Sequence, residues 1–256
     1  MLNTFFFSIL RKFKNLFSII SSIYFQIKLQ FSFYIFNKGR KYLYNETKIL
    51  RENGYIHLKK VIDKNLIEDL LKRYENEIFE EKIKKTSYYK FDIHLDADQT
   101  QKFVSYLNKK NIFNICKDYL GKIGILNCKI NYQNENNCET DSMQPHHDTR
   151  GNDLKIYAWL SNYDIKSHPL YYLKKSHRNT KFFITYNHHR RKDISKEEMD
   201  KIYGDKGDVV IFDTHGWHSN VKIDTTERAV LELTVIPRNR MFKSFSDDEN
   251  LLIKSI

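Results

Sequence analysis

The spacing of apolar residues predicts helices in the first half of the chain and short strands in the second half. Asp63 can cap a helix, and the residues after it are apolar at every third or fourth position, as in an amphipathic helix: Leu66, Ile67, Leu70, Leu71, Tyr74 and Ile78. Residues 103–120 predict another helix by the same spacing. Residues 49–58 predict the end of a helix, with a stop at Gly54, followed by a strand. Residues 80–100 are polar and predict a loop or lid.

The second half of the chain contains apolar runs of strand length. These runs occupy residues 123–130, 156–160, 169–173, 209–212 and 229–236. A long polar and basic stretch, residues 178–201, predicts an exposed insertion. Helices followed by several strands with no helices between them favour an α+β fold, mainly β, built on a largely antiparallel sheet sandwich.

The first 45 residues differ from the rest of the chain, because apolar and aromatic residues dominate them and basic residues flank the apolar part. No small-residue cleavage site of a signal peptide follows that part, and Lys28 near its middle disfavours a membrane-spanning helix. The pattern is typical of a helix lying in the membrane interface. A helical extension packed on the domain or on a second subunit is the alternative. We therefore divide the chain into an extension (1–45), a folded domain (46–240) and a C-terminal tail (241–256).

The composition narrows the classes of partner. The 256 residues carry a formal charge of +11, but Lys and Arg are spread along the chain and form no basic, aromatic block typical of a nucleic-acid module. We expect a small-molecule substrate and no nucleic acid, and the sequence does not define an oligomeric state. Cys116, Cys128 and Cys138 are odd in number and lack CxxC spacing, which disfavours a disulfide framework and a structural zinc site. They suit a reducing compartment, so we expect a cytoplasmic protein, peripheral to a membrane where residues 1–45 bind one.

The candidate chemistry centres on His146 and Asp148. These residues are two apart, so on an extended strand both side chains leave the same face. A third imidazole from a distant strand would complete a set of two histidines and one carboxylate, which is typical of non-haem Fe(II) with open positions for substrate and oxygen. His215 and His218 are the distal candidates. A local cluster of Asp213 with these two histidines is the rival arrangement.

Arg228 lies ten residues after His218, at the start of the last predicted strand. A guanidinium there could form a bidentate pair with one carboxylate of a bound dicarboxylic acid. A structural ion pair is the alternative role for this arginine. His147 should point to the opposite strand face from its neighbours and serve packing, and His177 is expected to hold a turn rather than a metal.

Together these motifs resemble the phytanoyl-CoA dioxygenase-like branch of the Fe(II)/2-oxoglutarate-dependent oxygenases, from about residue 53 to residue 237. The segments that carry the resemblance are Glu52-Asn53-Gly54-Tyr55, His146-x-Asp148, Asp153 to Trp159, Pro169-Leu170 with Ser176-His177, and Gly207-Asp208 with His218 and Arg228. The gap between His218 and Arg228 and the preceding Trp217 match the family pattern, which favours His218 over His215 as a ligand.

The resemblance implies a double-stranded β-helix (jelly-roll) core with helices packed on one sheet. The iron ligands that the resemblance implies are His146, Asp148 and His218. The implied contacts to 2-oxoglutarate are Arg228, Trp159 and Asn220. The implied reaction consumes O2, releases succinate and CO2, and hydroxylates an unactivated C–H bond. Related halogenases lack the carboxylate that matches Asp148, so we expect a hydroxylase.

The chain departs from the family pattern at a few positions. Ser167-His168-Pro169 stands where the family usually has an Asn-Gly-Pro turn, and Lys175 replaces the Gly before Ser-His. Val230 replaces the small hydroxyl residue often found two positions after the arginine. The basic surface and apolar N-terminal segment favour a lipid-like or CoA-linked anionic substrate. A non-catalytic jelly-roll binding protein that retains the metal motif, and a membrane-associated assembly protein, are the alternative functions.

Overall fold

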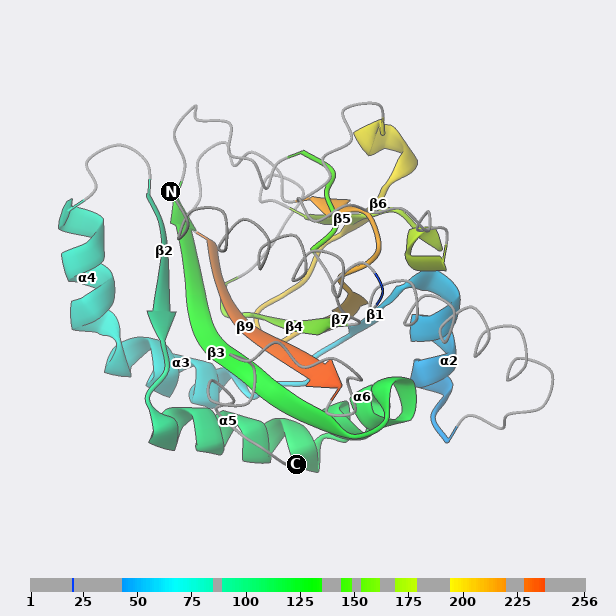
Figure 1. The fold of residues 1–256 in the computed structure, drawn as a ribbon. Helices are drawn as coiled ribbons and strands as arrows, with labels where there is room; N and C mark the ends of the chain where they lie inside the picture. The colour runs from blue at the N-terminus through cyan, green and yellow to red at the C-terminus, as the bar shows by residue number, and fades with distance from the viewer. Residues whose placement is uncertain are drawn as a thin grey trace, which may run out of the picture.

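Two antiparallel sheets form the centre of the computed structural model (Figure 1). The structure describes residues 20, 43–84, 89–134, 144–148, 153–161, 169–178, 194–219 and 228–237. The larger sheet has the strand order β1-β7-β4-β9-β3-β2, and the smaller sheet has the order β6-β5-β8. The strands are β1 (Tyr55–Leu58), β2 (Tyr89–His94), β3 (Ile123–Asn134), β4 (Leu154–Trp159), β5 (Leu170–Tyr172), β6 (Asp200–Ile202), β7 (Val209–Asp213), β8 (His218–Ser219) and β9 (Arg228–Pro237).

The helices pack against one face of the larger sheet, and the smaller sheet lies on the other side (Figure 1). The helices are α2 (Asn45–Asn53), α3 (Lys64–Arg73), α4 (Glu75–Lys84), α5 (Ala97–Lys109) and α6 (Ile112–Leu120), with short 3-10 turns η2 (Ser176–Arg178) and η3 (Lys196–Glu198). The main core lies between helices and sheet, where Phe103 and Phe113 pack with Leu231 and Leu233.

Strand β9 contributes side chains to the cores on both faces of the larger sheet. Every residue of β9 is buried, and successive side chains of a strand point to opposite faces. Leu231, Leu233 and Val235 join the helix-side core, whereas Val230 joins a second core that contains residues of both sheets, such as Trp159 and Tyr172. We call the face of the larger sheet turned toward the smaller sheet the inner face.

Local sequence signals set the helix boundaries. The Asp63 carboxylate accepts a hydrogen bond from the Asn65 N–H at 2.8 Å, which caps α3 as predicted. Asp96 caps α5 in the same way through the N–H of Gln99. Gly54 ends α2 with φ +90°, a left-handed conformation, and its N–H donates to the carbonyl of Leu50. The helix stop predicted at Gly54 is therefore confirmed.

The predicted α+β fold with mainly antiparallel sheets is confirmed, but some element assignments were wrong. Residues 80–100 are not a loop, because they contain the end of α4, strand β2 and the start of α5. In β2, Phe91 and Ile93 alternate with Asp92 and face the core, a period-two pattern that the many charged neighbours masked. Each of the two helices predicted after Gly54 is in fact a pair of shorter helices, α3 with α4 and α5 with α6, because the chain turns between the members of each pair.

The end of the predicted insertion is also less exposed than expected. Residues 179–193 lie outside the described part of the chain, but Ile194 and Met199 are buried against Tyr171. Strand β6 then pairs with β5. This part of the stretch therefore belongs to the smaller sheet.

Several sequence predictions concern residues outside the described part of the chain. They include the N-terminal extension apart from residues 20 and 43–45, the C-terminal tail, residues 162–168 and Cys138. Cys116 and Cys128 are buried free thiols. Within the described residues, no helix has the length and apolar character needed to cross a membrane. The division into three segments stays a prediction.

Candidate metal centre

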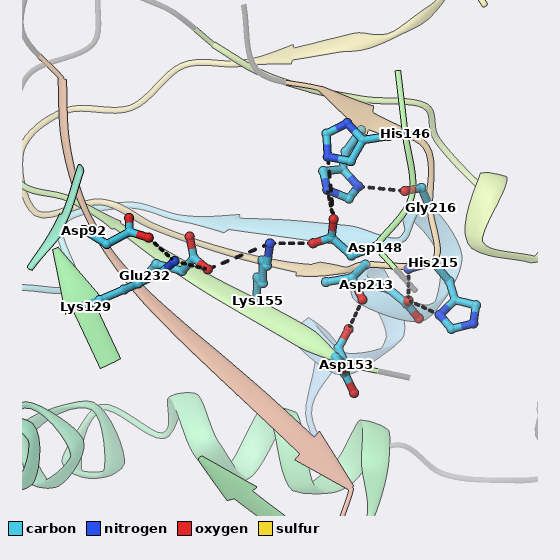
Figure 2. Close-up of polar contacts among 12 residues, drawn as sticks. Asp92, Lys129, His146, Asp148, Asp153, Lys155, Asp213, His215, Gly216 and Glu232 are labelled. Carbon is cyan, nitrogen blue, oxygen red and sulfur yellow. Dashed lines mark hydrogen bonds and ion pairs between the residues drawn. The ribbon is translucent and has the colours of Figure 1, made fainter. Parts of the chain in front are cut away.

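The structure brings His146, Asp148 and His218 together although the distal histidine lies far along the chain. The Nε2 atoms of His146 and His218 lie 3.6 Å and 3.7 Å from the Oδ1 atom of Asp148 (Figure 2). Candidate ligand atoms of the three residues all lie within 4.8 Å of one another. A single small cation could therefore contact all three side chains.

Backbone hydrogen bonds fix this arrangement from two sides. His146 and His218 form an isolated antiparallel bridge, which aligns the segment before Asp148 with the end of the β7–β8 connection. The N–H of Asp148 donates to the carbonyl of Thr214 at 2.8 Å. Thr214 is itself fixed, because its N–H and its hydroxyl both donate to the carbonyl of Asp153. The backbone of Asp148 is thus held by the same turn that leads into His218.

The tautomers of the two histidines suit metal binding. Nδ1 of His146 lies 2.8 Å from the carbonyl of Gln144, and Nδ1 of His218 lies 2.9 Å from the carbonyl of Gly216. A carbonyl oxygen only accepts, so each Nδ1 carries the hydrogen and donates. Each Nε2 then presents a lone pair toward Asp148. A hydrogen bond from the non-ligating nitrogen is the arrangement found in metal-binding histidines.

The charges at the site also suit a divalent metal. Burial and the neighbouring His218 lower the pKa of His146 to about 4, so this imidazole is neutral near pH 7. Burial opposes ionisation of Asp148, but Lys155 and His218 hold the pKa of its carboxyl well below the usual value. Two imidazole nitrogens and one carboxylate oxygen are the donor set of non-haem Fe(II) centres. The residues present therefore fit the metal that the sequence implies.

His215 lies apart from this cluster. Its backbone N–H donates to Oδ1 of Asp213 at 2.9 Å, and the other oxygen of Asp213 accepts a hydrogen bond from the Tyr119 hydroxyl at 2.6 Å. Asp213 thereby ties the end of β7 to helix α6. Within the described residues, the rival cluster of Asp213, His215 and His218 does not converge as a candidate metal group.

The remaining histidines of the motifs hold the scaffold. His147 is buried and packs edge-on against Trp217, with ring centroids 4.9 Å apart. His177 is also buried, and its Nε2 lies 3.0 Å from the carbonyl of Arg51. Next to it, the Ser176 hydroxyl accepts a hydrogen bond from the N–H of Trp217. The packing role predicted for His147 and the turn role predicted for His177 are confirmed, and both support the segment that carries His218.

The Gly207-Asp208 motif secures the entry to strand β7. Gly207 has φ +97°, and its carbonyl accepts a hydrogen bond from the N–H of Ile62. The fully buried Asp208 carboxylate accepts from the N–H groups of Lys60 and Asp205 and also pairs with the side chains of His57 and Lys59, each at 3.0 Å. This motif is therefore structural and does not contact the metal cluster.

Two of the predicted co-substrate residues, Arg228 and Trp159, lie on the inner face of the larger sheet. Arg228 is the first residue of β9, is 4% exposed and stands opposite Gln133 of β3. Trp159 is buried between the two sheets, and its ring lies 5.2 Å from that of His57. Asn220 lies outside the described residues. The carboxylate-binding roles of these residues stay predictions.

Tyr157, which the sequence analysis did not single out, lies on the inner face within electrostatic reach of both Arg228 and Asp148. Burial and the charge of Glu232 raise the pKa of Tyr157 above its usual value, whereas the charges of Lys155 and Arg228 act in the opposite direction. All these side chains therefore share one electrostatic environment on the inner face.

A row of charged side chains on the inner face was also missed. The row consists of Lys155, Glu232, Lys129 and Asp92 and runs from Asp148 across strands β4, β9, β3 and β2 (Figure 2). The sequence held one signal, because Glu232 interrupts an otherwise apolar strand on the same face as Arg228. Recognising the row requires the strand order, which the sequence pattern does not give.

Comparison with solved structures supports the fold. No family model matches the chain, and no curated protein matches its sequence. The epimerase SnoN, solved with Fe3+, alpha ketoglutarate and nogalamycin RO, has a TM-score of 0.55 and 12% identity, over 80% of this chain and 87% of SnoN. HygX from Streptomyces hygroscopicus, solved with nickel and 2-oxoglutarate, has a TM-score of 0.55 and 13% identity, over 77% of this chain and 88% of HygX.

EctD from S. alaskensis, solved with bound Fe, has a TM-score of 0.58 and 15% identity, over 78% of each chain. At these identities the similarity shows the fold. The chain has the jelly-roll architecture of non-haem iron, 2-oxoglutarate-dependent enzymes, so the resemblance inferred from the sequence motifs is confirmed at the level of the fold.

Proposed function

We propose that this chain is a non-haem Fe(II)- and 2-oxoglutarate-dependent dioxygenase that hydroxylates an unactivated C–H bond of a small organic substrate. The observation that carries the proposal is the convergence of His146, Asp148 and His218, with each imidazole oriented by a hydrogen bond from Nδ1 to a carbonyl. The jelly-roll fold supports it independently, because the similar structures with bound iron or nickel share that architecture.

One set of residues would bind the metal, and another would bind its co-substrate. His146, Asp148 and His218 would hold the iron, and Arg228 would pair with the far carboxylate of 2-oxoglutarate, with Trp159 and Asn220 as further contacts. When bound, iron with 2-oxoglutarate and O2 would supply the oxidation of the C–H bond, with release of succinate and CO2. The protein orients the ligands and excludes water from the site, which is the usual division of roles in cofactor enzymes.

The substrate is expected to be polar at least where it faces the metal. The charged row beside Asp148 lies on the inner face, and a wholly apolar ligand packed against it would remove water from these charges without offering them a hydrogen bond. Among the predicted classes, this arrangement favours a substrate that carries polar groups, such as a CoA-linked one, over a plain hydrocarbon chain. The cytoplasmic location and the membrane association through residues 1–45 stay predictions.

An anaerobic titration with Fe(II) and then 2-oxoglutarate tests the proposal. The readout is the weak visible charge-transfer band of the iron chelate. We expect the band in the wild type and in His215→Ala, and its loss in His146→Ala and in His218→Ala. The exposed His94 provides the surface control, because His94→Ala changes a histidine far from the three ligands in the fold.

The controls separate loss of a ligand from loss of the fold. Circular dichroism of each variant should match the wild type, since the hydrogen bonds that join His146 to His218 are between their backbones and survive a change of side chain. A folded wild type that shows no band would overturn the dioxygenase proposal and favour a non-catalytic jelly-roll binding protein. A band that requires His215 but not His146 would instead support the rival cluster.

A further inference from the structure

The two oxygens of the Asp148 carboxylate face different partners. Oδ1 faces the Nε2 atoms of both His146 and His218. Oδ2 forms an ion pair with the ammonium group of Lys155 (Figure 2). A metal held by the two histidines would therefore meet one oxygen of Asp148, while the other oxygen is already engaged by a cation.

Strand β4 delivers Lys155 to this position. Leu154, Ile156 and Ala158 are fully buried in the helix-side core, so the intervening Lys155, together with Tyr157, projects from the inner face. Across the strand, Lys155 stands opposite Phe212 in β7 and Thr234 in β9. The long side chain thus rises from the middle of the sheet toward Asp148.

A second carboxylate holds Lys155 from the other side. Nζ of Lys155 lies 3.8 Å from Oε1 of Glu232, which also lies 3.7 Å from Nζ of Lys129. Lys129 in turn pairs with Asp92 at 2.7 Å. The charges alternate in sign along the row, so each lysine stands between two carboxylates and its position is fixed by opposing attractions.

We propose that Lys155 is a positioning residue that keeps Asp148 a single-oxygen ligand by withholding Oδ2 from the metal. The inference rests on the proposed function. A two-histidine, one-carboxylate centre works by leaving coordination positions open, and a carboxylate that bound through both oxygens would fill one of them. The ammonium group prevents this, and its charge favours the approach of the dianionic 2-oxoglutarate.

The row also offers a matched control. Lys129 is a lysine on the same face, 17% exposed, held between the carboxylates of Asp92 and Glu232. Lys155 is 20% exposed and held between Asp148 and Glu232. Only Lys155 contacts a candidate metal ligand. If both lysines serve merely to neutralise carboxylates, then replacing either lysine should change metal and 2-oxoglutarate binding to a similar extent.

The experiment uses Co(II) as a spectroscopic probe in the full chain, followed by titration with 2-oxoglutarate. In Lys155→Met we expect Co(II) still to bind, because all three ligands remain, but its visible spectrum to change before 2-oxoglutarate is added. The affinity for 2-oxoglutarate should then fall roughly tenfold, the usual scale for groups that orient metal ligands. Lys155→Arg should restore the wild-type spectrum, and Lys129→Met should retain it.

The outcomes distinguish this inference from the proposed function. If the wild type binds Co(II) through His146 and the Co(II) spectrum of Lys155→Met is unchanged, then only the positioning role is overturned. An unchanged spectrum with weakened 2-oxoglutarate binding would show that Lys155 contacts the co-substrate instead, and would also overturn it. Failure of the wild type to bind Co(II) or Fe(II) would overturn both. If Lys155→Met unfolds, Lys155→Ala takes its place, because it also removes the ammonium group, and an unchanged Co(II) spectrum in that variant would overturn the positioning role.

Discussion

The backbones of His146 and His218 donate hydrogen bonds to each other in both directions, at 2.9 Å and 2.8 Å. This reciprocal pair is the narrow pairing of an antiparallel ladder, and it places the two imidazole rings 4.5 Å apart between centroids. The distance between the candidate ligands is therefore set by the backbone. The side chains can be changed singly without removing the bridge that positions them.

The arginine at the start of β9 should bind a carboxylate in a manner that lysine cannot reproduce. Arg228→Lys keeps the charge but loses the planar fork that forms two parallel hydrogen bonds. We expect the dissociation constant of 2-oxoglutarate to rise roughly tenfold or more, while Fe(II) binding is retained. Isothermal titration of the metal-loaded protein checks this. The exposed Arg73, changed to Lys, is the control, and equal effects of the two substitutions would contradict a specific role for Arg228.

The metal-free protein should lose stability as the pH falls below about 6.5. Burial and the adjacent His218 lower the pKa of His146 to about 4 in the folded state, whereas an unfolded chain has the ordinary value of about 6.5. Between these values the unfolded state binds more protons, so the free energy of unfolding falls as the pH falls, by roughly 3 kcal/mol in total. Burial also lowers the pKa of His177, which adds an effect of the same sign.

Urea denaturation at several pH values in the presence of a chelator measures this dependence. The variant His146→Gln should have a shallower slope between pH 6.5 and 4 than the wild type. The exposed His94 is the control, because His94→Gln should leave the wild-type slope nearly unchanged. An identical slope in His146→Gln and the wild type would show that the buried imidazole is not responsible.

Gly54 should tolerate no side chain, because it combines a left-handed backbone with a close approach. A Cβ atom at this position would lie 2.5 Å from Nδ1 of His177 and 2.5 Å from the Tyr172 hydroxyl. Gly121 also has a positive φ of +85°, although its ψ of −137° places it outside the left-handed region of Gly54, and a Cβ atom there would meet no atom within 4 Å, so Gly121→Ala has a backbone penalty without a clash. We expect Gly54→Ala to lower the free energy of unfolding by about 3 kcal/mol and Gly121→Ala by about 1 kcal/mol. Equal losses in chemical denaturation would argue against the clash.

Lys175 should be replaceable by glycine with a gain in stability. Its φ is +64°, in the left-handed region that penalises residues with a Cβ, and the side chain is exposed. Because glycine also has greater freedom in the unfolded chain, the net gain in the free energy of unfolding should be about 0.5 kcal/mol. The adjacent Lys174 lacks a positive φ, so Lys174→Gly should lower the melting temperature while Lys175→Gly raises it.

Local patterns in the sequence allowed much of the fold to be predicted. The cap at Asp63, the stop at Gly54 and the apolar runs of β4, β7 and β9 each depend on neighbours within a few residues. Strand β2 was missed because its polar face and flanking charges obscure a short alternation. Its strand conformation is stabilised by pairing with β3, a contact between segments well separated along the chain.

The sequence by itself determined the types of metal ligand, the likeness of the motifs to an oxygenase family and the position of Arg228 at a strand start. The resemblance of the motifs already favoured His218 over His215, but only the tertiary structure shows that His218 meets His146 and Asp148 and that Lys155 engages the second oxygen of the carboxylate. The physical reason is that ligand spacing along one strand follows from a local period of two, whereas strand order and cross-strand register join segments that are far apart in the chain. The register of the bridge between His146 and His218 selects which side chains converge.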